Sequence, residues 1–205
     1  MNAFARLVLA SSAAAAIVAV EVGAEQQSAQ SLIERGAYAE AVQRVQTERD
    51  AGNADPTSAY LAGQAYLRLD QPQPAREEFA RLANGQDEGW KAIGQSAIAL
   101  IDGAMDEAVN EATRARDING DLGFAHYQLG LAQLRRNDWD AAAQALDRSC
   151  ELMPGFAYAF YNAGVAHQRA KRFNQMAERF QTFMQLAPDA PERKMVQLAL
   201  NALRG

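Results

Sequence analysis

Apolar and small residues recur along this chain at a period close to 34 positions. A column of small residues at Ala41, Ala75, Ala108 and Ala142, continued by Met176, has successive spacings of 34, 33, 34 and 34 residues. Three positions before each member stands a bulky or stiff residue, and these residues are Tyr38, Pro72, Met105, Trp139 and Phe173. A fixed period of about 20–50 residues predicts a solenoid, in which each unit packs only against its neighbours.

Each period reads as two helices joined by a short turn. In the fourth period, residues 124–134 form the first predicted helix, and the second runs from Trp139 to Leu152, where Pro154 and Gly155 stop it. The turn falls at Asn137, a residue type that tolerates a left-handed backbone. Gly36, Asp70 and Gly103 stand at the matching positions, with Lys171 as the exception.

Small and large residues alternate between the two helices of a unit. The small positions of the first helices are Gly63, Ser96, Gly130 and Gly164. The large positions of the second helices are Phe79, Leu146 and Phe180. Because a single helical hairpin cannot bury both sets, three or more stacked units are required.

These residues resemble the tetratricopeptide repeat (TPR) family. The pattern is clearest in the fourth unit, with Leu129-Gly130, Trp139, Ala142, Leu146 and Pro154. The resemblance covers about residues 25–190 and implies an all-α, right-handed solenoid of about five helix-turn-helix units with a C-terminal capping helix. Units one and three depart from the pattern, with Ala29 in place of glycine, Ser96 after Gln95, and Ala112 where a large residue is usual.

The phase of the repeat predicts the organisation of the chain. The expected units lie near residues 25–55, 56–88, 89–122, 123–156 and 157–190. Residues 191–205 form the expected capping helix, in which Met195, Leu198, Ala199 and Ala202 recur at helical spacing.

Residues 1–24 lie outside the repeat and read as a cleaved signal peptide. One positive charge precedes an apolar run from Leu7 to Val20, and small residues at Val22-Gly23-Ala24 suit a signal peptidase. The run is shorter than the ~20 residues that span a bilayer as a helix. We therefore expect a periplasmic or secreted protein of exported bacterial type that begins at Glu25, and an inner-membrane anchor facing the periplasm is the alternative. Membrane contact would then come only through this uncleaved segment.

Charge and side-chain chemistry argue against several classes of function. Twenty Lys and Arg against 25 Asp and Glu give a net charge of −5, without a basic stripe for nucleic acid. The histidines, His126 and His167, and the single cysteine, Cys150, show no metal-binding or catalytic spacing. We therefore expect no metal, no cofactor, no small-molecule substrate and no enzymatic activity.

The resemblance also implies a binding face. In TPR proteins the first helix of each unit lines a concave groove, and the corresponding positions repeat a tyrosine and an arginine in three units. The implied peptide-binding residues are Tyr60, Gln64, Arg68, Phe124, Tyr127, Gln128, Arg135, Tyr158, Tyr161, Asn162, Gln168 and Arg169. Unit three interrupts this stripe with an apolar set, which is Trp90, Ile93, Ala97 and Ile101. The lysine of the family's carboxylate clamp is missing, but the arginines favour an acidic or carboxylate-bearing ligand.

Two interpretations of this stripe remain open at this point. In the first, the protein is a non-enzymatic scaffold of the bacterial envelope that binds a protein or peptide in its groove. In the second, the tyrosines pack against neighbouring helices and the arginines are solvated. An alternative function is a structural subunit of an envelope assembly or secretion machine, for pili, outer-membrane proteins or surface polymer, with contacts on the convex face or the caps.

Overall fold

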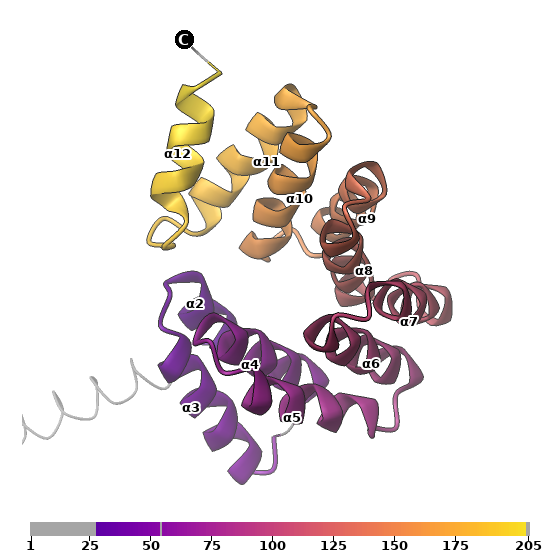
Figure 1. Cartoon of the computed structure of the whole chain (residues 1–205). Coiled ribbons are helices and arrows are strands. Elements are labelled where there is room, and N and C mark those ends of the chain that lie inside the picture. The colour runs from indigo at the N-terminus through magenta and orange to yellow at the C-terminus, as the bar shows by residue number, and fades with distance from the viewer. Residues whose placement is uncertain (1–27, 54, 204–205) are drawn as a thin grey trace, which may run out of the picture.

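The computed structural model describes residues 28–53 and 55–203, and this part of the chain holds eleven helices and no strand. The predicted signal peptide lies outside the described residues. The helices are α2 (Ala29–Glu34), α3 (Tyr38–Asp50), α4 (Pro56–Arg68), α5 (Pro72–Ala83), α6 (Glu88–Asp102), α7 (Met105–Ile118), α8 (Gly123–Arg136), α9 (Trp139–Leu152), α10 (Ala157–Arg169), α11 (Phe173–Leu186) and α12 (Arg193–Asn201). Consecutive helices pack in pairs and wind into a tightly curved solenoid (Figure 1). The predicted all-α solenoid with a terminal helix is confirmed.

Each pair of helices turns on a residue with a left-handed backbone. Gly36, Asp70, Gly103, Asn137 and Lys171 all have φ between 56° and 77°. The sequence pattern marked Lys171 as the exception, yet its φ of 58° matches the others. The turn geometry is therefore repeated in all five pairs, because the packing of the helices imposes it even where the side chain does not favour it.

Within three of the pairs, a large side chain of the second helix lies directly over a glycine of the first. An added Cβ at Gly63, Gly130 or Gly164 would lie well under 3.0 Å from the nearest atom of Phe79, Leu146 or Phe180, respectively. The small-residue column of the second helices is equally enclosed: its four alanines have no exposed surface, and Met176 has 1%. The close spacing between the two helices of a pair thus depends on the absence of a side chain at these glycines.

The third pair, α6 and α7, replaces this packing with a hydrogen-bonded network. Ser96 stands in the glycine position, and its hydroxyl donates to the Ala108 carbonyl oxygen at 2.8 Å. The Gln128 amide donates to the Ser96 hydroxyl at 3.0 Å, and the Tyr60 hydroxyl donates to Gln128 Oε1 at 2.7 Å. Ala112 stands where the other units have a large side chain, so no such side chain packs over Ser96. The hydrogen-bonded network replaces that packing and links units two, three and four.

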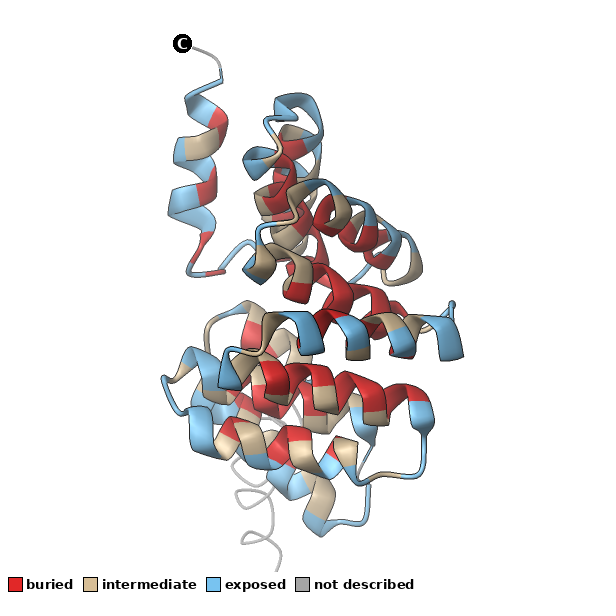
Figure 2. Cartoon of the chain, turned by 45° about the vertical axis from the view of Figure 1, so that its right-hand side comes forward, coloured by how far each residue is buried: buried red, intermediate tan, exposed pale blue. Residues whose placement is uncertain are grey.

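The terminal helix α12 buries a different face from the one that the sequence predicted. Val196 and Leu200 are buried, whereas Met195 and Leu198 are 57% and 70% exposed. Figure 2 shows α12 largely exposed along its outer side. Contacts of Pro191 and Glu192 hold the segment before α12, and they set the rotation of this helix about its axis. The spacing of apolar residues in α12 could not predict these contacts.

Gly164→Ala is expected to destabilise the fold because its Cβ would overlap the Phe180 ring. Overpacking of this kind costs about 1–3 kcal/mol. Urea denaturation followed by far-UV circular dichroism measures the change. Gly155→Ala is the matched control, since an added Cβ there meets nothing within 4 Å and Gly155 has an ordinary φ. Equal stability of the two variants would show that the glycine-to-ring contact does not set the helix spacing.

Candidate functional site

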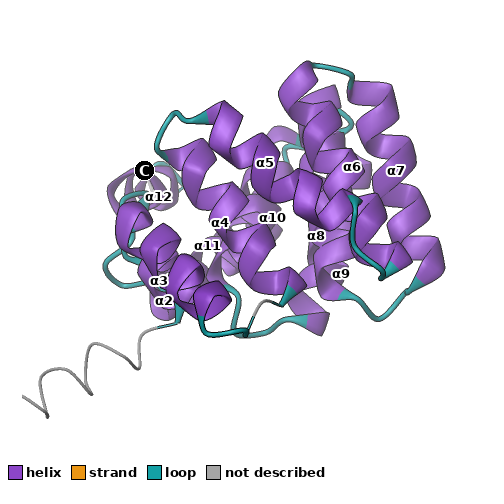
Figure 3. Ribbon diagram, turned by 90° about the horizontal axis from the view of Figure 1, so that it is seen from below, coloured by secondary structure: helices purple, strands orange, loops and turns teal. Residues whose placement is uncertain are grey.

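The two ends of the solenoid touch, so that its inner face is closed on itself. Glu34 in α2 accepts a hydrogen bond from the backbone N–H of Ala157, the first residue of α10, at 3.2 Å. Gln30 donates to the Gly155 carbonyl oxygen at 2.9 Å. Figure 3 shows α2 and α3 on the same side of the molecule as α12. The first unit therefore supplies a cap to a helix that lies 123 residues later in the chain.

A second closing contact joins α4 to the segment before α12. The Arg68 guanidinium bonds to Glu192 and lies 4.8 Å from the centre of the Tyr158 ring. The Tyr158 hydroxyl donates to Glu192 Oε2 at 2.9 Å. Pro191 packs beside Gly36, where an added Cβ would lie 2.6 Å from the proline ring. We call the three residues Arg68, Tyr158 and Glu192 the clasp.

Packing between neighbouring units buries much of the predicted binding stripe. Five of the twelve predicted residues are buried, with exposures of 0–8%, and these are Tyr60, Phe124, Tyr127, Gln128 and Tyr158. Most of their rings form one aromatic cluster around Tyr60, whose centroid lies 5.3 Å from that of Phe124 and 6.3 Å from that of Tyr127. In the structure these five side chains pack between units and do not line an open groove.

Seven predicted residues retain exposed surface, and several of them meet at one mouth of the interior. A cleft of about 490 Å³ lies between the C-terminal ends of α4, α6 and α8. Gln64, Arg68, Arg135 and Asn162 line it, and the buried Gln128 reaches its wall. Tyr161, Gln168 and Arg169 lie outside the lining, and the Arg169 guanidinium stacks 5.7 Å from the centre of the Trp139 ring. The structure thus reduces the long stripe to a compact cleft.

The floor of the cleft is apolar and two arginines stand on its rim. The apolar lining residues are Leu67, Pro72, Phe79, Ala97, Leu100, Ile101, Leu131 and Leu134. Ile101 occupies the column that holds Arg68 and Arg135 in the neighbouring units, so an apolar centre separates two cations. Arg135 has no hydrogen-bond or ion-pair partner among the described residues. Each arginine also lies in the last turn of its helix, where a cation complements the helix dipole.

Sequence reasoning missed Glu192, which is only 9% exposed and completes the clasp. Glu192 lies beyond the fifth period, so the repeat phase assigned no role to it. Sequence reasoning also missed Leu67, Leu100 and Leu134, which stand one position before the predicted rim column. Their shared leucine identity at a nearly constant spacing was the available signal.

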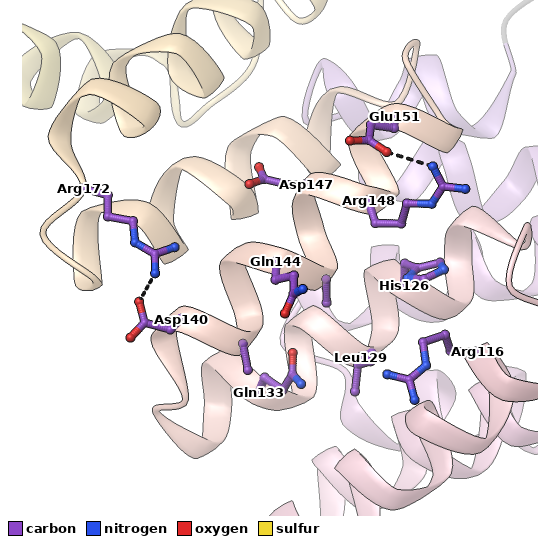
Figure 4. Close-up of a pocket in the computed structure, with 12 residues that line it drawn as sticks. Arg116, His126, Leu129, Gln133, Asp140, Gln144, Asp147, Arg148, Glu151 and Arg172 are labelled. Carbon is purple, nitrogen blue, oxygen red and sulfur yellow. Dashed lines mark hydrogen bonds and ion pairs between the residues drawn. The ribbon is translucent and has the colours of Figure 1, made fainter.

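A second, larger hollow lies on the outer face between α7 and α9. It has a volume of about 860 Å³, and Figure 4 shows that polar side chains from several helices surround it. Between α3 and α5, Arg49 forms an ion pair of 2.5 Å with Glu78. Two periods later in the sequence, Arg116 stands at the position of Arg49 and Ala145 at the position of Glu78. The alanine removes the acidic partner, and Arg116 pairs with its neighbour Asp117 instead. The gap between α7 and α9 therefore lacks the bridge found between α3 and α5.

The cysteine and the two histidines are engaged within the packed helices. Burial raises the pKa of the Cys150 thiol to about 12, so the thiol stays protonated at neutral pH. His126 Nε2 lies 2.9 Å from the Gly120 carbonyl oxygen, and His167 Nε2 lies 3.0 Å from Asp147. Among the described residues, no cluster of three or more His, Cys, Asp or Glu is placed to hold a metal ion. In the same part of the chain, no helix has the length and apolarity needed to cross a membrane.

The comparisons with known proteins agree with this architecture. A family model described as "Tetratricopeptide repeat" matches residues 124–152, the fourth unit. No curated protein sequence matches the chain. The fold is that of a TPR solenoid, a class that generally serves as a scaffold for protein interactions.

Three solved structures illustrate the likeness. TTC0263, a TPR protein of Thermus thermophilus, is 17% identical with a TM-score of 0.60, covering 80% of this chain and 91% of its own. The TPR2AB domain of yeast Sti1, solved in complex with pHSP90, is 13% identical with a TM-score of 0.52, covering 83% and 80%. YrrB, described as a TPR protein with an unusual peptide-binding site, is 22% identical with a TM-score of 0.50, covering 86% and 89%.

Glu34 is expected to make the stability of the fold depend on pH. Burial raises the pKa of this carboxyl, and this effect outweighs the hydrogen bonds from Gln30 and Ala157 that lower it. Between the ordinary value and the raised one, the folded state binds more protons than the unfolded state, so this contribution to stability falls as pH rises. The unfolding free energy of the wild type minus that of Glu34→Gln should therefore fall as pH rises above about 4, the ordinary range of a glutamate.

Urea titrations of both proteins across this pH range measure the difference. Glu40→Gln, which removes an exposed carboxyl in α3, serves as the control for the loss of one negative charge. A rise with pH for Glu34→Gln would mean that the folded state favours the charged carboxylate, contrary to this account.

Proposed function

We propose that this protein is a non-enzymatic TPR scaffold of the bacterial cell envelope that binds a segment of a partner protein in the interior cleft. The observation that carries the proposal is the cleft itself. It gathers an apolar floor, two rim arginines and polar amides from four units at one place. Arginine is one of the residue types that most often supply the energy of protein recognition.

The composition of the cleft suits a short peptide segment. Leu67, Leu100 and Ile101 offer apolar surface for one or two aliphatic side chains, and Leu67 is 39% exposed. The Gln64 amide and the Asn162 amide oxygen can bond a peptide backbone. A protein partner is also supported by the structurally similar proteins, since YrrB is described with a peptide-binding site and the Sti1 domain was solved with pHSP90.

A structural role in an envelope assembly is the second candidate, and the outer hollow favours it. Arg116 faces a position where the acidic partner of the repeat has become Ala145. A subunit that inserts a carboxylate beside Arg116 would restore the missing bridge. Binding at this face would leave the interior cleft unused, so the two functions are separable by mutation.

The export proposal concerns residues 1–24, which would direct the chain across the inner membrane and be removed before Glu25. Fractionation of bacteria that produce the full chain, followed by N-terminal sequencing, tests it. A periplasmic or secreted product beginning at Glu25 supports cleavage. A membrane-bound product that retains Met1 supports the anchored alternative, and a cytoplasmic product contradicts export.

Arg135→Glu is expected to weaken peptide binding because it reverses the charge of the unpaired rim cation. Peptides selected by phage display against the protein should lose affinity about tenfold or more, which corresponds to about 1.4 kcal/mol. Fluorescence anisotropy with the selected peptides measures the loss. Circular dichroism checks that the variant, changed at an exposed residue, remains folded.

Arg148→Glu, a charge reversal beside the outer hollow, is the matched control and should leave the affinity unchanged. Loss of affinity only in the Arg148 variant would transfer the binding site to the outer face. Selection of no peptide that either variant weakens would refute peptide binding at both places.

A further inference from the structure

One residue, Arg68, belongs both to the proposed binding cleft and to the contact that closes the solenoid. Its side chain lines the cleft beside Leu67 and Gln64. The same guanidinium bonds to the Glu192 carboxylate and stacks on the Tyr158 ring. The cleft rim and the closure therefore compete for one cation.

Glu192 reaches Arg68 in the manner of a bound ligand. Its carboxylate is almost fully enclosed and takes bonds from two donors, the Arg68 guanidinium and the Tyr158 hydroxyl. The segment that delivers it also buries Ala187 and Ala190, which are 2% and 5% exposed. A short stretch with small apolar side chains and one carboxylate is thus held at the inner face of the solenoid.

Arg135 shows what the corresponding arginine looks like without such a partner. It lies in the same column two units later and lines the same cleft, and it is exposed and unpaired among the described residues. One rim arginine is therefore occupied by a carboxylate of the chain itself, and the other remains available.

We propose that Glu192 is an internal competitor for a ligand carboxylate at Arg68, so that ligand binding releases the clasp and opens the solenoid. This inference rests on the proposed function, and it specifies the ligand as a segment that carries a carboxylate beside apolar side chains. The exchange replaces one ion pair by another, so its cost stays small, and the released Glu192 returns to water. Opening would uncover Tyr158, which is 2% exposed in the closed form.

The closing contacts are of a kind that can be exchanged. They consist of the clasp, the Glu34 and Gln30 hydrogen bonds and the packing of Pro191 against Gly36. Two of these, the Gln30 bond and the Arg68 side chain, are open to solvent. A ligand that takes Arg68 therefore removes the most strongly charged of the closing contacts.

Distance measurements between spin labels on the two ends of the solenoid test this inference. Labels at Ala39→Cys in α3 and Lys194→Cys in α12, two exposed positions, are placed in a Cys150→Ala background. Glu192→Gln and Arg68→Gln should each shift the distance distribution to longer values. The double variant should open no further than either single one, because both changes break the same contact. Glu178→Gln, an exposed carboxyl in α11, is the matched control and should leave the distribution unchanged.

The ligand arm uses the peptides selected by phage display. A selected peptide should lengthen the wild-type distance and should bind Glu192→Gln at least about threefold more tightly than the wild type, because the competitor is gone. The same peptide with its acidic residues changed to amides should do neither.

Three results would separate the claims. If Glu192→Gln keeps the distance distribution of Glu178→Gln, the clasp does not hold the solenoid closed and the inference is overturned. If peptides bind the wild type without lengthening the distance, the exchange is overturned while the proposed function stands. If Glu192→Gln opens the solenoid but no cleft-binding peptide exists, the proposed function fails while the clasp is supported.

Discussion

The packing of a large side chain over a bare glycine is the contact on which the rest of this structure depends. Phe79 over Gly63, Leu146 over Gly130 and Phe180 over Gly164 bring the two helices of a unit together at one fixed separation. Because the separation repeats, successive pairs stack with the same geometry and the chain curves steadily. The third unit reaches a similar result by another route, in which Ser96 and Gln128 replace apolar contact with buried hydrogen bonds.

Tight curvature has a direct consequence for function. The inner faces of α4 and α8 approach each other and their aromatic rings pack together, and α10 joins them through Asn162. The Tyr60 hydroxyl then bonds to Gln128, two units away, and Asn162 donates to the Tyr127 hydroxyl at 2.9 Å. Residues that would recognise a ligand in an open solenoid serve as core in a closed one. The mouth near Ile101 retains room for a ligand, and it keeps the two rim arginines that the periodicity had placed there.

Contacts between sequence neighbours explain the helix pairs. Contacts between distant parts of the chain explain the features that the repeat did not predict. The period predicted a succession of helix pairs, because small and large residues at constant spacing encode contacts between sequence neighbours. Lys171 adopts the left-handed turn against its own preference, since the flanking helices determine the turn. The rotation of α12 depends on contacts between the two ends of the chain, and the burial of Tyr60 depends on Phe124 and Gln128, which lie two units away. Such contacts leave no periodic signal in a single sequence. The role of Glu192, which lies outside the repeat, could not be predicted for the same reason.

The energetic scale of the closure decides whether it can regulate the cleft. Partly exposed ion pairs and hydrogen bonds contribute about 1 kcal/mol or less each, so a few of them hold the ends together by only a few kcal/mol. An open form at this level is a minor population, and a ligand that binds only this form loses apparent affinity in proportion to that population. A ligand that also takes over Arg68 recovers part of that loss, because the contact it breaks is replaced by one that it makes. The same residue can therefore keep the interior closed without a partner and favour opening with one.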